Sequence, residues 1–445
     1  MALAVSGAVP CAATAQAPAP PMRLGELYAR VVQDNPAMSA AKARARAAEA
    51  RVPGARRPSD PQIQLGFMNY SLPNLGPMPP LDMRQLQVMQ MVPLGGKLAI
   101  AGRVADAQAG ASASRARDVE WKLRNEAALA FYDLYAADRQ VDVARETLGL
   151  LADIGRTAES MYRVGEGRQA DVLRATVAIA KMAQDTLRMH AMREAAIARI
   201  NALGNRAPGD PVSTAVRPRF PDSLPPRRAL DSIATSGRPS IVAGMQDVQA
   251  ADAATALARR EIIPDLQVAV QYGQRGSSMS DANGHTSPAI ERMGSLMIGA
   301  SVPIFARNRQ MQMRTEAEAM KAMALSELAA MRAETVGGIG ETLADLARAR
   351  DLVRLYRATV LPQAEATVAS ALASYRVGAV DFMTLLDGQM TVNGYRQELV
   401  GLEAEEGKAW ARLEMLVGRE LLDPNSTAEP GKAPGAGADT KEGAR

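Results

Sequence analysis

Alternating apolar and polar positions predict two pairs of strands. The segment from Gln62 to Tyr70 begins with this alternation, and the segment from Leu266 to Tyr272 repeats it. A period of two is typical of a strand with one apolar face and one polar face. A second strand is predicted after each of these, near Arg84–Val92 and Met293–Val302. Each strand would run for about 8–10 residues, the length of a tilted membrane-spanning strand.

The loops within these pairs are predicted to run from Ser71 to Met83 and from Gly273 to Arg292. Both segments are rich in Gly, Pro, Asn and Ser, which favour turns. Long turn-rich loops suit the outward end of an outer-membrane barrel. Phe67, Tyr70 and Tyr272 fit either an aromatic girdle of such a barrel or the packing of a soluble sheet, and the pattern leaves both open.

After Pro93 and again after Pro303 the pattern becomes helical for more than about 50 residues. At 1.5 Å per residue such helices reach roughly 80–100 Å, which requires a coiled-coil partner. Apolar positions in the returning segments step by three and four, with several Ala and Gly that allow close helix approach. The first seam consists of Leu173, Val177, Ala180, Ala183 and Leu187, and the second of Leu385, Gly388, Val392, Tyr395, Leu399 and Leu402.

The chain repeats its own pattern. Tyr162-Arg163-Val164-Gly165 recurs 213 residues later as Tyr375-Arg376-Val377-Gly378, and the segment 60–65 is matched by 263–268. We therefore predict a first repeat over residues 22–204, a proline-rich linker over 205–226 and a second repeat over 227–422. The tail at 423–445 is polar and rich in Gly, Pro and Ala, which predicts disorder.

Residues 1–17 have the character of a secretory signal remnant. They are small and apolar and end in Ala13-Thr14-Ala15 or Ala15-Gln16-Ala17, both typical of cleavage sites. The first basic residue is Arg23, so the positive segment that begins such signals is missing and a flexible end is the alternative. Cys11 is a candidate for lipidation, which the preceding Pro10 disfavours.

The Tyr-Arg-Val-Gly copies predict two helix–turn–helix corners. Gly165 and Gly378 are suited to end the outgoing helices, because glycine adopts the left-handed conformation of a C-cap. The returning helices are predicted to start near Arg168 and Asp381. These two positions are equivalent in the repeats, whereas Asp171 is equivalent to Thr384.

Composition narrows the classes of function. The chain has 445 residues, a net charge of +4 without long charged runs, and a single cysteine. This argues against a nucleic-acid partner and excludes an internal disulfide framework. No apolar run is long enough for a membrane-spanning helix, so membrane entry would require strands in a closed barrel. His190 and His285 are the only histidines, and no catalytic or nucleotide-binding motif is present, so we expect neither an enzyme nor a cofactor.

Two tandem copies of helix, strand, strand, long helix, glycine turn and long helix resemble the TolC family of outer-membrane efflux proteins. The resemblance covers the chain from about Met22 to Leu422. The Tyr-x-x-Gly turns resemble the family's periplasmic tip. Val92–Lys97 and Val302–Arg309 resemble its strand-to-helix junctions, with Pro93 and Pro303 at their centres.

The resemblance implies a mainly α fold with a small membrane β-barrel. Three protomers of a homotrimer would each give four strands to a 12-stranded barrel in outer-membrane lipid, on a long α-helical periplasmic tunnel. Such a channel conducts solutes passively and needs no cofactor. Its implied partners are a periplasmic adaptor protein and an inner-membrane pump.

The resemblance also implies roles for the tip. We expect the two turns to dock the adaptor, through Tyr162, Arg163, Val164, Gly165, Tyr375, Arg376, Val377 and Gly378. Asp171 and Asp381 are candidates for a carboxylate constriction. Stabilisation of the helix N-terminus is the alternative role for Asp171.

Methionine is unusually frequent, with 24 residues. Many fall in or just after the strand pairs: Met68, Met78, Met83, Met89, Met91, Met293, Met297, Met311, Met313, Met320 and Met323. Thioether sulfur prefers soft Cu(I) or Ag(I), and the sequence looks closer to the heavy-metal branch of the family, but methionine is also a flexible apolar filler. Metal export, drug or small-organic export and type I secretion therefore all remain open as functions. A soluble periplasmic coiled-coil scaffold is the alternative from another class.

Overall fold

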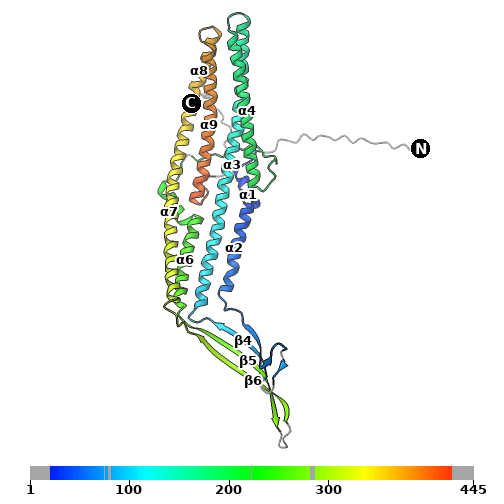
Figure 1. Ribbon diagram of the computed structural model, residues 1–445. Coiled ribbons are helices and arrows are strands. Elements are labelled where there is room, and N and C mark those ends of the chain that lie inside the picture. Colours follow the sequence, from blue (N-terminus) through cyan, green and yellow to red (C-terminus); the bar gives the residue numbers. More distant parts are fainter. Residues whose placement is uncertain (1–20, 75, 79–81, 222, 281–285, 423–445) are drawn as a thin grey trace, which may run out of the picture. The chain divides into compact units, whose positions relative to one another are not determined.

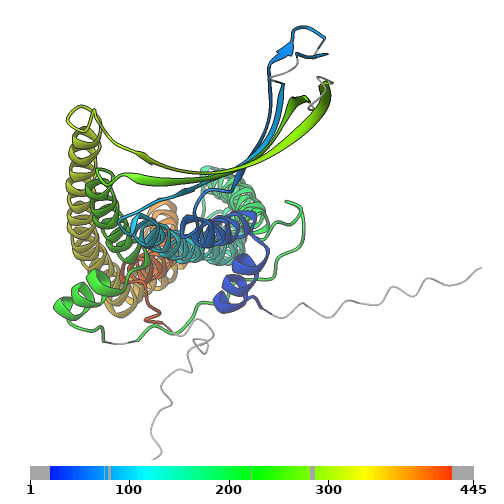
Figure 2. The same ribbon diagram turned by 90° about the horizontal axis from the view of Figure 1, so that it is seen from below.

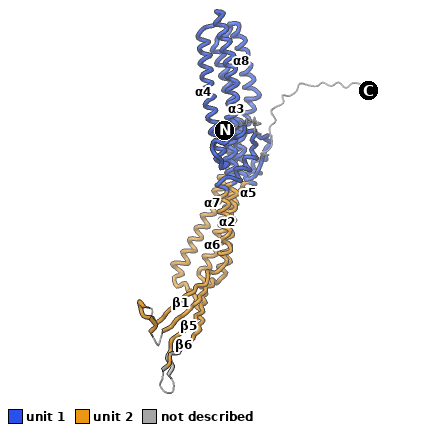
Figure 3. Tube along the Cα trace, turned by 90° about the vertical axis from the view of Figure 1, so that its right-hand side faces the viewer, with its two compact units in different colours: residues 1–38, 120–233, 337–445 blue, residues 39–119, 234–336 orange. Residues whose placement is uncertain are grey.

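The computed structural model describes residues 21–74, 76–78, 82–221, 223–280 and 286–422. The predicted signal remnant at 1–17, Cys11, His285 and the tail at 423–445 lie outside these residues. The chain forms two compact units, coloured separately in Figure 3. The helical unit comprises the described parts of residues 1–38, 120–233 and 337–445, and the sheet unit comprises those of 39–119 and 234–336.

The sheet unit contains a four-stranded antiparallel sheet in the order β1-β4-β5-β6 (Figures 1 and 2). Its strands are β1 (Gln62–Met68), β4 (Met83–Val92), β5 (Asp265–Ser280) and β6 (Thr286–Ser301). A short ladder of β2 (Tyr70–Ser71) and β3 (Gly76–Pro77) lies between β1 and β4 in sequence. The two strand pairs expected from alternation are present, and β4 and β5 join them into one sheet that is not closed.

The predicted loop from Gly273 to Arg292 is wrong. β5 and β6 pair in continuous register from Asp265 opposite Ser301 to Ser280 opposite Thr286, so each has 16 residues and not 8–10. Antiparallel pairing uses backbone N–H and C=O groups, so the glycines and serines that suggested a loop do not stop it. Gly276 N also donates to Asp82 O at 2.9 Å, which holds the ribbon to the residue before β4.

Long helices leave the sheet directly. α3 (Lys97–Arg163) follows β4, with Pro93 between them, and α7 (Gln310–Leu355) follows β6 and Pro303. Lys97 is buried and its Nζ lies 2.9 Å from Asp265 Oδ1 and 3.5 Å from Glu261 Oε2, which ties the start of α3 to the start of β5. The unit is completed by most of α2 (Pro36–Ala55) and by α6 (Pro239–Arg260).

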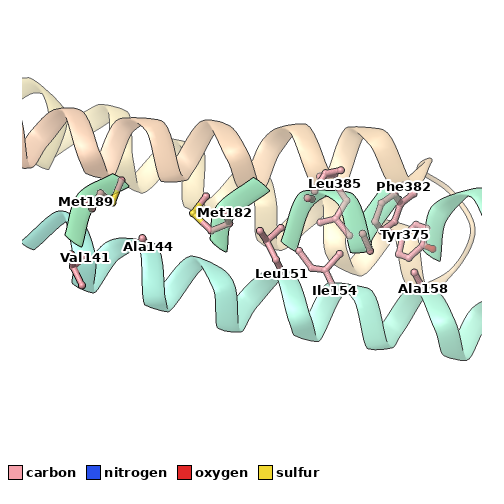
Figure 4. Close-up of a cluster of buried hydrophobic side chains, with 13 residues drawn as sticks. Val141, Ala144, Leu151, Ile154, Ala158, Met182, Met189, Tyr375, Phe382 and Leu385 are labelled. Carbon is pink, nitrogen blue, oxygen red and sulfur yellow. The ribbon is translucent and has the colours of Figure 1, made fainter. Parts of the chain in front are cut away.

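The helical unit contains two long hairpins. The first is formed by α3 and α4 (Gln169–Leu203). In the second, α7 continues through a π-helical turn, η1 (Tyr356–Val360), into α8 (Leu361–Arg376), and α9 (Phe382–Val417) returns. Side chains from both hairpins share one apolar cluster, in which Met182, Leu385 and Phe382 face the space between the helices (Figure 4). The short helices α1 (Leu24–Asp34) and α5 (Arg227–Gly237) belong to the same unit.

The structure confirms one of the two predicted apolar helix seams and not the other. In α9 the seam is confirmed, since Leu385, Val392 and Leu402 are buried. In α4 the predicted seam is exposed: Leu173, Val177 and Leu187 are 59%, 67% and 72% exposed, and Ala180 and Ala183 are exposed as well. Over the same stretch of α4 the buried positions are instead Ala175, Ala178, Met182 and Met189. At 100° per residue they lie on the opposite side of the helix, so α4 has two apolar stripes and the spacing selected the uncovered one.

The proline-rich linker is ordered against α9. Arg217 Nη2 lies 2.5 Å from Glu406 Oε2, and Arg350 of α7 reaches the same carboxylate at 3.1 Å and Pro221 O at 2.7 Å. The ring of Phe220 stacks on that of Trp410, with centroids 5.9 Å apart. Charged and aromatic contacts thus fix a segment whose prolines rule out a helix.

Candidate functional site

The turn between α3 and α4 is set by two glycines. Gly165 has φ +82°, and Glu166 N and Gly167 N both donate to Met161 O at 2.9 Å. A Cβ on Gly167 would lie 2.7 Å from Tyr162 N, which is closer than real Cβ atoms approach a backbone atom. Gly165 therefore supplies the left-handed C-cap and Gly167 allows the chain to turn back closely.

The turn between α8 and α9 repeats this geometry. Gly378 has φ +72°, and Ala379 N donates to Ser374 O at 2.9 Å, the equivalent of the bond from Glu166 to Met161. Each turn places five residues between its helices. The predicted C-caps and the starts of the returning helices are therefore where the sequence indicated.

The two tip tyrosines are used differently. Tyr162 is 47% exposed, whereas Tyr375 is 6% exposed and packs edge-to-face on Phe382, with ring centroids 5.7 Å apart. Val164 and Val377 are 67% and 79% exposed. The exposed tip surface is thus made by the two valines, Tyr162 and the neighbouring arginines, Arg163 and Arg376, while Tyr375 supports the turn from inside.

The structure brings the two candidate carboxylates together around Arg174. Asp171 lies in the first turn of α4, with Arg174 Nη1 4.0 Å from its Oδ1, and its charge contributes, after burial, to the raised pKa of Tyr375. Asp381 is the N-cap of α9: its Oδ1 accepts from Thr384 Oγ1 at 2.5 Å and from Thr384 N at 3.1 Å. These hydrogen bonds lower the pKa of Asp381, with smaller contributions from Arg174 and Arg168. Asp381 is therefore charged at neutral pH, and both carboxylates are already engaged within the chain.

Two grooves run below the tip in the helical unit. One, of about 420 Å³, lies between α3, α8 and α9, with Leu150, Ile154 and Leu372 among its apolar lining residues. The other, of about 430 Å³, lies between α4 and α9 and includes Leu173 and Val177 of the exposed stripe. Sequence reasoning did not predict these grooves, because they depend on how side chains of different helices meet.

The sheet has one face that is apolar along most of its length. We define the apolar face by its register-matched aliphatic and aromatic residues: Ile63, Leu65, Phe67, Leu86, Val88, Val92, Leu266, Val268, Val270, Tyr272, Ile290, Leu296 and Ile298. Most are exposed, including Phe67 at 58% and Tyr272 at 45%. Polar residues enter this face at Gln90 and again at Arg84 and Gln274.

The opposite face combines amides, hydroxyls and thioethers with a few charged groups. This polar face contains Gln62, Gln64, Gln85, Gln87, Gln267, Gln271 and Ser295, the charged residues Asp265, Arg275 and Glu291, and Met68, Met83, Met89, Met91, Met293 and Met297. Gln271 Nε2 of β5 donates to Gln85 Oε1 of the neighbouring β4 at 2.5 Å. Within each strand, the alternate spacing of Gln and Met in the sequence indicates that they share a face. The strand register was needed to place the methionines of separate strands on one face.

Conventional metal ligands are not grouped in the described part of the chain. No three His, Cys, Asp or Glu side chains there come together in a group that could hold a metal ion. His190 lies half-buried on α4. No helix among the described residues is long and apolar enough to cross a membrane.

The fold is similar to those of several solved outer-membrane channels. The structure of CusC aligns with a TM-score of 0.76 at 18% identity, over 89% of this chain and 92% of that one. The outer membrane protein VceC from Vibrio cholerae aligns with a TM-score of 0.74 at 16% identity, over 89% and 96%. The CmeC channel of Campylobacter jejuni aligns with a TM-score of 0.74 at 13% identity, over 90% and 87%.

The sequence matches one family model in both halves. No curated protein sequence matches the chain. The model described as outer membrane efflux protein matches residues 27–205 and 230–419, one match for each predicted repeat. The predicted resemblance to TolC-type channels and the predicted lack of enzymatic activity are thereby confirmed, and the chain belongs to the outer membrane efflux protein family, a family of channels.

Proposed function

We propose that the chain is the outer-membrane channel-tunnel of a tripartite efflux system. In this role it passively conducts solutes that an inner-membrane pump and a periplasmic adaptor deliver. The observation that carries the proposal is the sorting of the sheet into an apolar face and a polar face. An apolar face that stays exposed in the protomer suits lipid, and a face of amides, hydroxyls and thioethers suits an aqueous passage.

The open sheet supports a trimer as the complete channel. β1 and β6 are the edges of the four-stranded sheet, and a membrane-spanning sheet must have its edges paired. Three protomers pairing β6 of one with β1 of the next would close a 12-stranded barrel, within the range known for such barrels. The exposed stripe of α4 offers an apolar surface for a neighbouring protomer along the helical tunnel.

The tip is the proposed site of adaptor docking and gating. Its exposed valines and arginines form a surface that a helical hairpin of the adaptor can cover. Asp171 and Asp381 are the proposed constriction. Opening there would require the ion pair of Asp171 with Arg174 and the cap that Asp381 makes on α9 to change.

As cargo we propose soft metal ions such as Cu(I) or Ag(I). The support is the methionines on the polar face, since thioether sulfur favours these ions. Export of drugs or other small organic solutes, and type I secretion, are the alternatives that the test below separates from it.

Two measurements test the proposal. Native mass spectrometry of protein extracted from outer membranes in mild detergent is expected to show a homotrimer that precipitates when detergent is removed. A detergent-independent monomer would contradict the channel and support a soluble scaffold. A strain lacking the gene is expected to lose tolerance to copper and silver, with restoration by the intact gene. Loss of tolerance to hydrophobic drugs alone would assign the cargo to that class instead.

A further inference from the structure

We propose that the polar face of the sheet carries a thioether site for a soft monovalent ion, Cu(I) or Ag(I). The site is formed by Met89 of β4 and Met297 of β6, which meet across Ala269 of β5. The site makes the proposed cargo more specific. It rests on the proposed function, because that function directs the polar face towards the passage.

Methionine is sorted by face in this sheet. All six strand methionines whose side chains the structure describes lie on the polar face, and the Ile, Leu, Val and Phe residues of these strands lie on the other. A methionine that serves only as an apolar filler would follow the other apolar residues. The sorting therefore indicates that the thioether is used for its sulfur, among amides, and not for its hydrophobicity.

The register places two of these methionines on either side of a small residue. Ala269 pairs with Met89 on one side and with Met297 on the other. Strands lie about 4.8 Å apart, so the two methionine backbones are about 10 Å apart and their long side chains can meet above the alanine methyl. Ala269 is 4% exposed, although the sheet residues around it are half-buried or exposed. Neighbouring side chains thus already close over it.

The surroundings of this pair are polar but uncharged. Gln267 Nε2 donates to Met89 Sδ, which shows that the sulfur lies among the amides of the polar face. The rows on either side in register hold Gln64, Gln87, Gln271 and Ser295, and Met91, Gln267 and Gly299. No carboxylate stands in these rows, so a hard divalent ion finds only neutral oxygens there. A soft monovalent ion finds neutral sulfur.

A second methionine pair on the same face provides a contrast. Met293 is the register partner of Gly273, and Met83 Cε lies 2.5 Å from where a Cβ on that glycine would be. Arg275 is the register partner of Met83 and is itself paired with Glu291, so charged side chains stand beside this pair. The pair at Ala269 has no such neighbour in its row, which is why the site is assigned there.

A site of two neutral thioethers suits a passage. Thioethers carry no charge and hold soft ions through sulfur alone, so few of them bind less firmly than thiolates. An ion can then rest on the face and move on, which conduction requires.

The test measures Ag(I) binding to the purified full chain in detergent, with Cys11→Ser in every protein so that its thiol binds no silver, by titration and by X-ray absorption at the silver edge. Met89→Leu/Met297→Leu removes both sulfurs at nearly constant volume. Met320→Leu/Met323→Leu is the matched control, because these methionines of α7 are 51% and 47% exposed and lie outside the sheet. Wild type and control are expected to show silver–sulfur coordination, and the sheet variant to bind at least about tenfold more weakly, since thioethers are its only soft ligands. Circular dichroism and oligomeric state confirm that each variant is folded.

Unchanged Ag(I) affinity in the sheet variant, or silver without sulfur neighbours in the wild type, would overturn the site. Its failure differs from failure of the proposed cargo. If deletion of the gene leaves metal tolerance intact while the wild type binds Ag(I) through these sulfurs, the site stands and the cargo assignment falls. If tolerance depends on the gene but the sheet variant binds normally, the cargo assignment stands and the site falls.

Discussion

Single residues decide the geometry of the tip. Gly165 and Gly378 hold left-handed backbone conformations at equivalent positions, and Gly167 is required by a close approach to the preceding helix. Asp381 adds a side-chain cap to the second turn, whereas the equivalent Arg168 makes no such bond to α4. The two turns therefore have the same backbone but different electrostatic support.

Gly378→Ala is expected to destabilise the second hairpin by about 1–2 kcal/mol, because a left-handed conformation is unfavourable for any residue with a Cβ. An added Cβ would touch nothing within 4 Å, so the cost is conformational. Gly394→Ala in α9 is the control, since it also has open space but sits in a helix and is expected to stabilise by about 1 kcal/mol. Chemical unfolding followed by helical circular dichroism gives both signs. Equal effects would contradict the role of φ.

The cap of α9 is expected to depend on pH. The pKa of Asp381 is below its ordinary value of 3.8 in the folded chain, so the cap is intact at neutral pH. It is lost as pH falls below 3.8 and through the depressed pKa. The protection factor of the Thr384 amide, measured by hydrogen exchange, is expected to drop over that range. Asp381→Asn keeps an N-cap and is expected to remove the pH dependence, whereas Asp381→Ala lowers protection at every pH. A pH-independent wild type would refute the assignment.

At the scale of elements, the two hairpins match in length despite different construction. α3 is one continuous helix, whereas residues 310–376 are divided by the π-turn η1, with Pro362 just after it. A π-turn accommodates an irregularity in the backbone hydrogen bonds of a helix, and proline lacks the N–H that would donate one of these bonds. Around it Tyr356 packs edge-to-face on Tyr395, and Arg357 pairs with Glu403, so α9 stays attached across the irregularity.

The attachment of the linker to α9 depends on a buried ion pair. Arg217→Met is expected to lower the free energy of unfolding by about 3 kcal/mol, because the side chains of Arg217 and Glu406 are 15% and 7% exposed and the carboxylate would keep only Arg350. Arg348→Met is the matched control, since Arg348 and Glu405 are both about half exposed and their pair contributes less than about 1 kcal/mol. Urea unfolding compares them. Indistinguishable midpoints would show that the linker is not held by this pair.

At the scale of the whole molecule, a single chain leaves an apolar stripe of α4 exposed. α4 has its buried stripe on one side and Leu173, Val177 and Leu187 exposed on the other. A helix with two opposite apolar stripes is typical of a wall with neighbours on both sides. The proposed trimer supplies the second neighbour.

Val177→Glu/Leu187→Glu is expected to reduce the trimer fraction in native mass spectrometry, because two charges would be placed in an apolar contact between protomers. The two side chains are 67% and 72% exposed, so folding of the single chain is expected to be little changed. Arg145→Glu on α3, whose side chain is 62% exposed, serves as the charge-changing control. A full trimer yield from the double variant would exclude this stripe from the interface.

Much of the architecture follows from local signals. The glycines at 165 and 378, the apolar seam of α9 and the alternation in β1, β4 and β5 act within a few residues, and they predicted the turns, helices and strands. Features that depend on distant segments were missed or misjudged. The length of β5 is set by its partner β6, the stripe of α4 that becomes buried is chosen by its neighbours, and only the register places Met89 and Met297 on either side of Ala269. The contact of Arg217 with Glu406 joins positions 189 apart in the sequence.

The two unpaired edges of the sheet bear on how the protein is made. Within the described residues β1 and β6 each have a single partner in the sheet, and the aliphatic side between them is bare. In the proposed channel, a newly synthesised chain would carry these exposed strand edges through an aqueous compartment before it meets its own copies. Delivery, more than folding of the helices, would then be the stage most prone to aggregation, and chaperones that shield β1 and β6 would determine how much of the protein reaches the membrane.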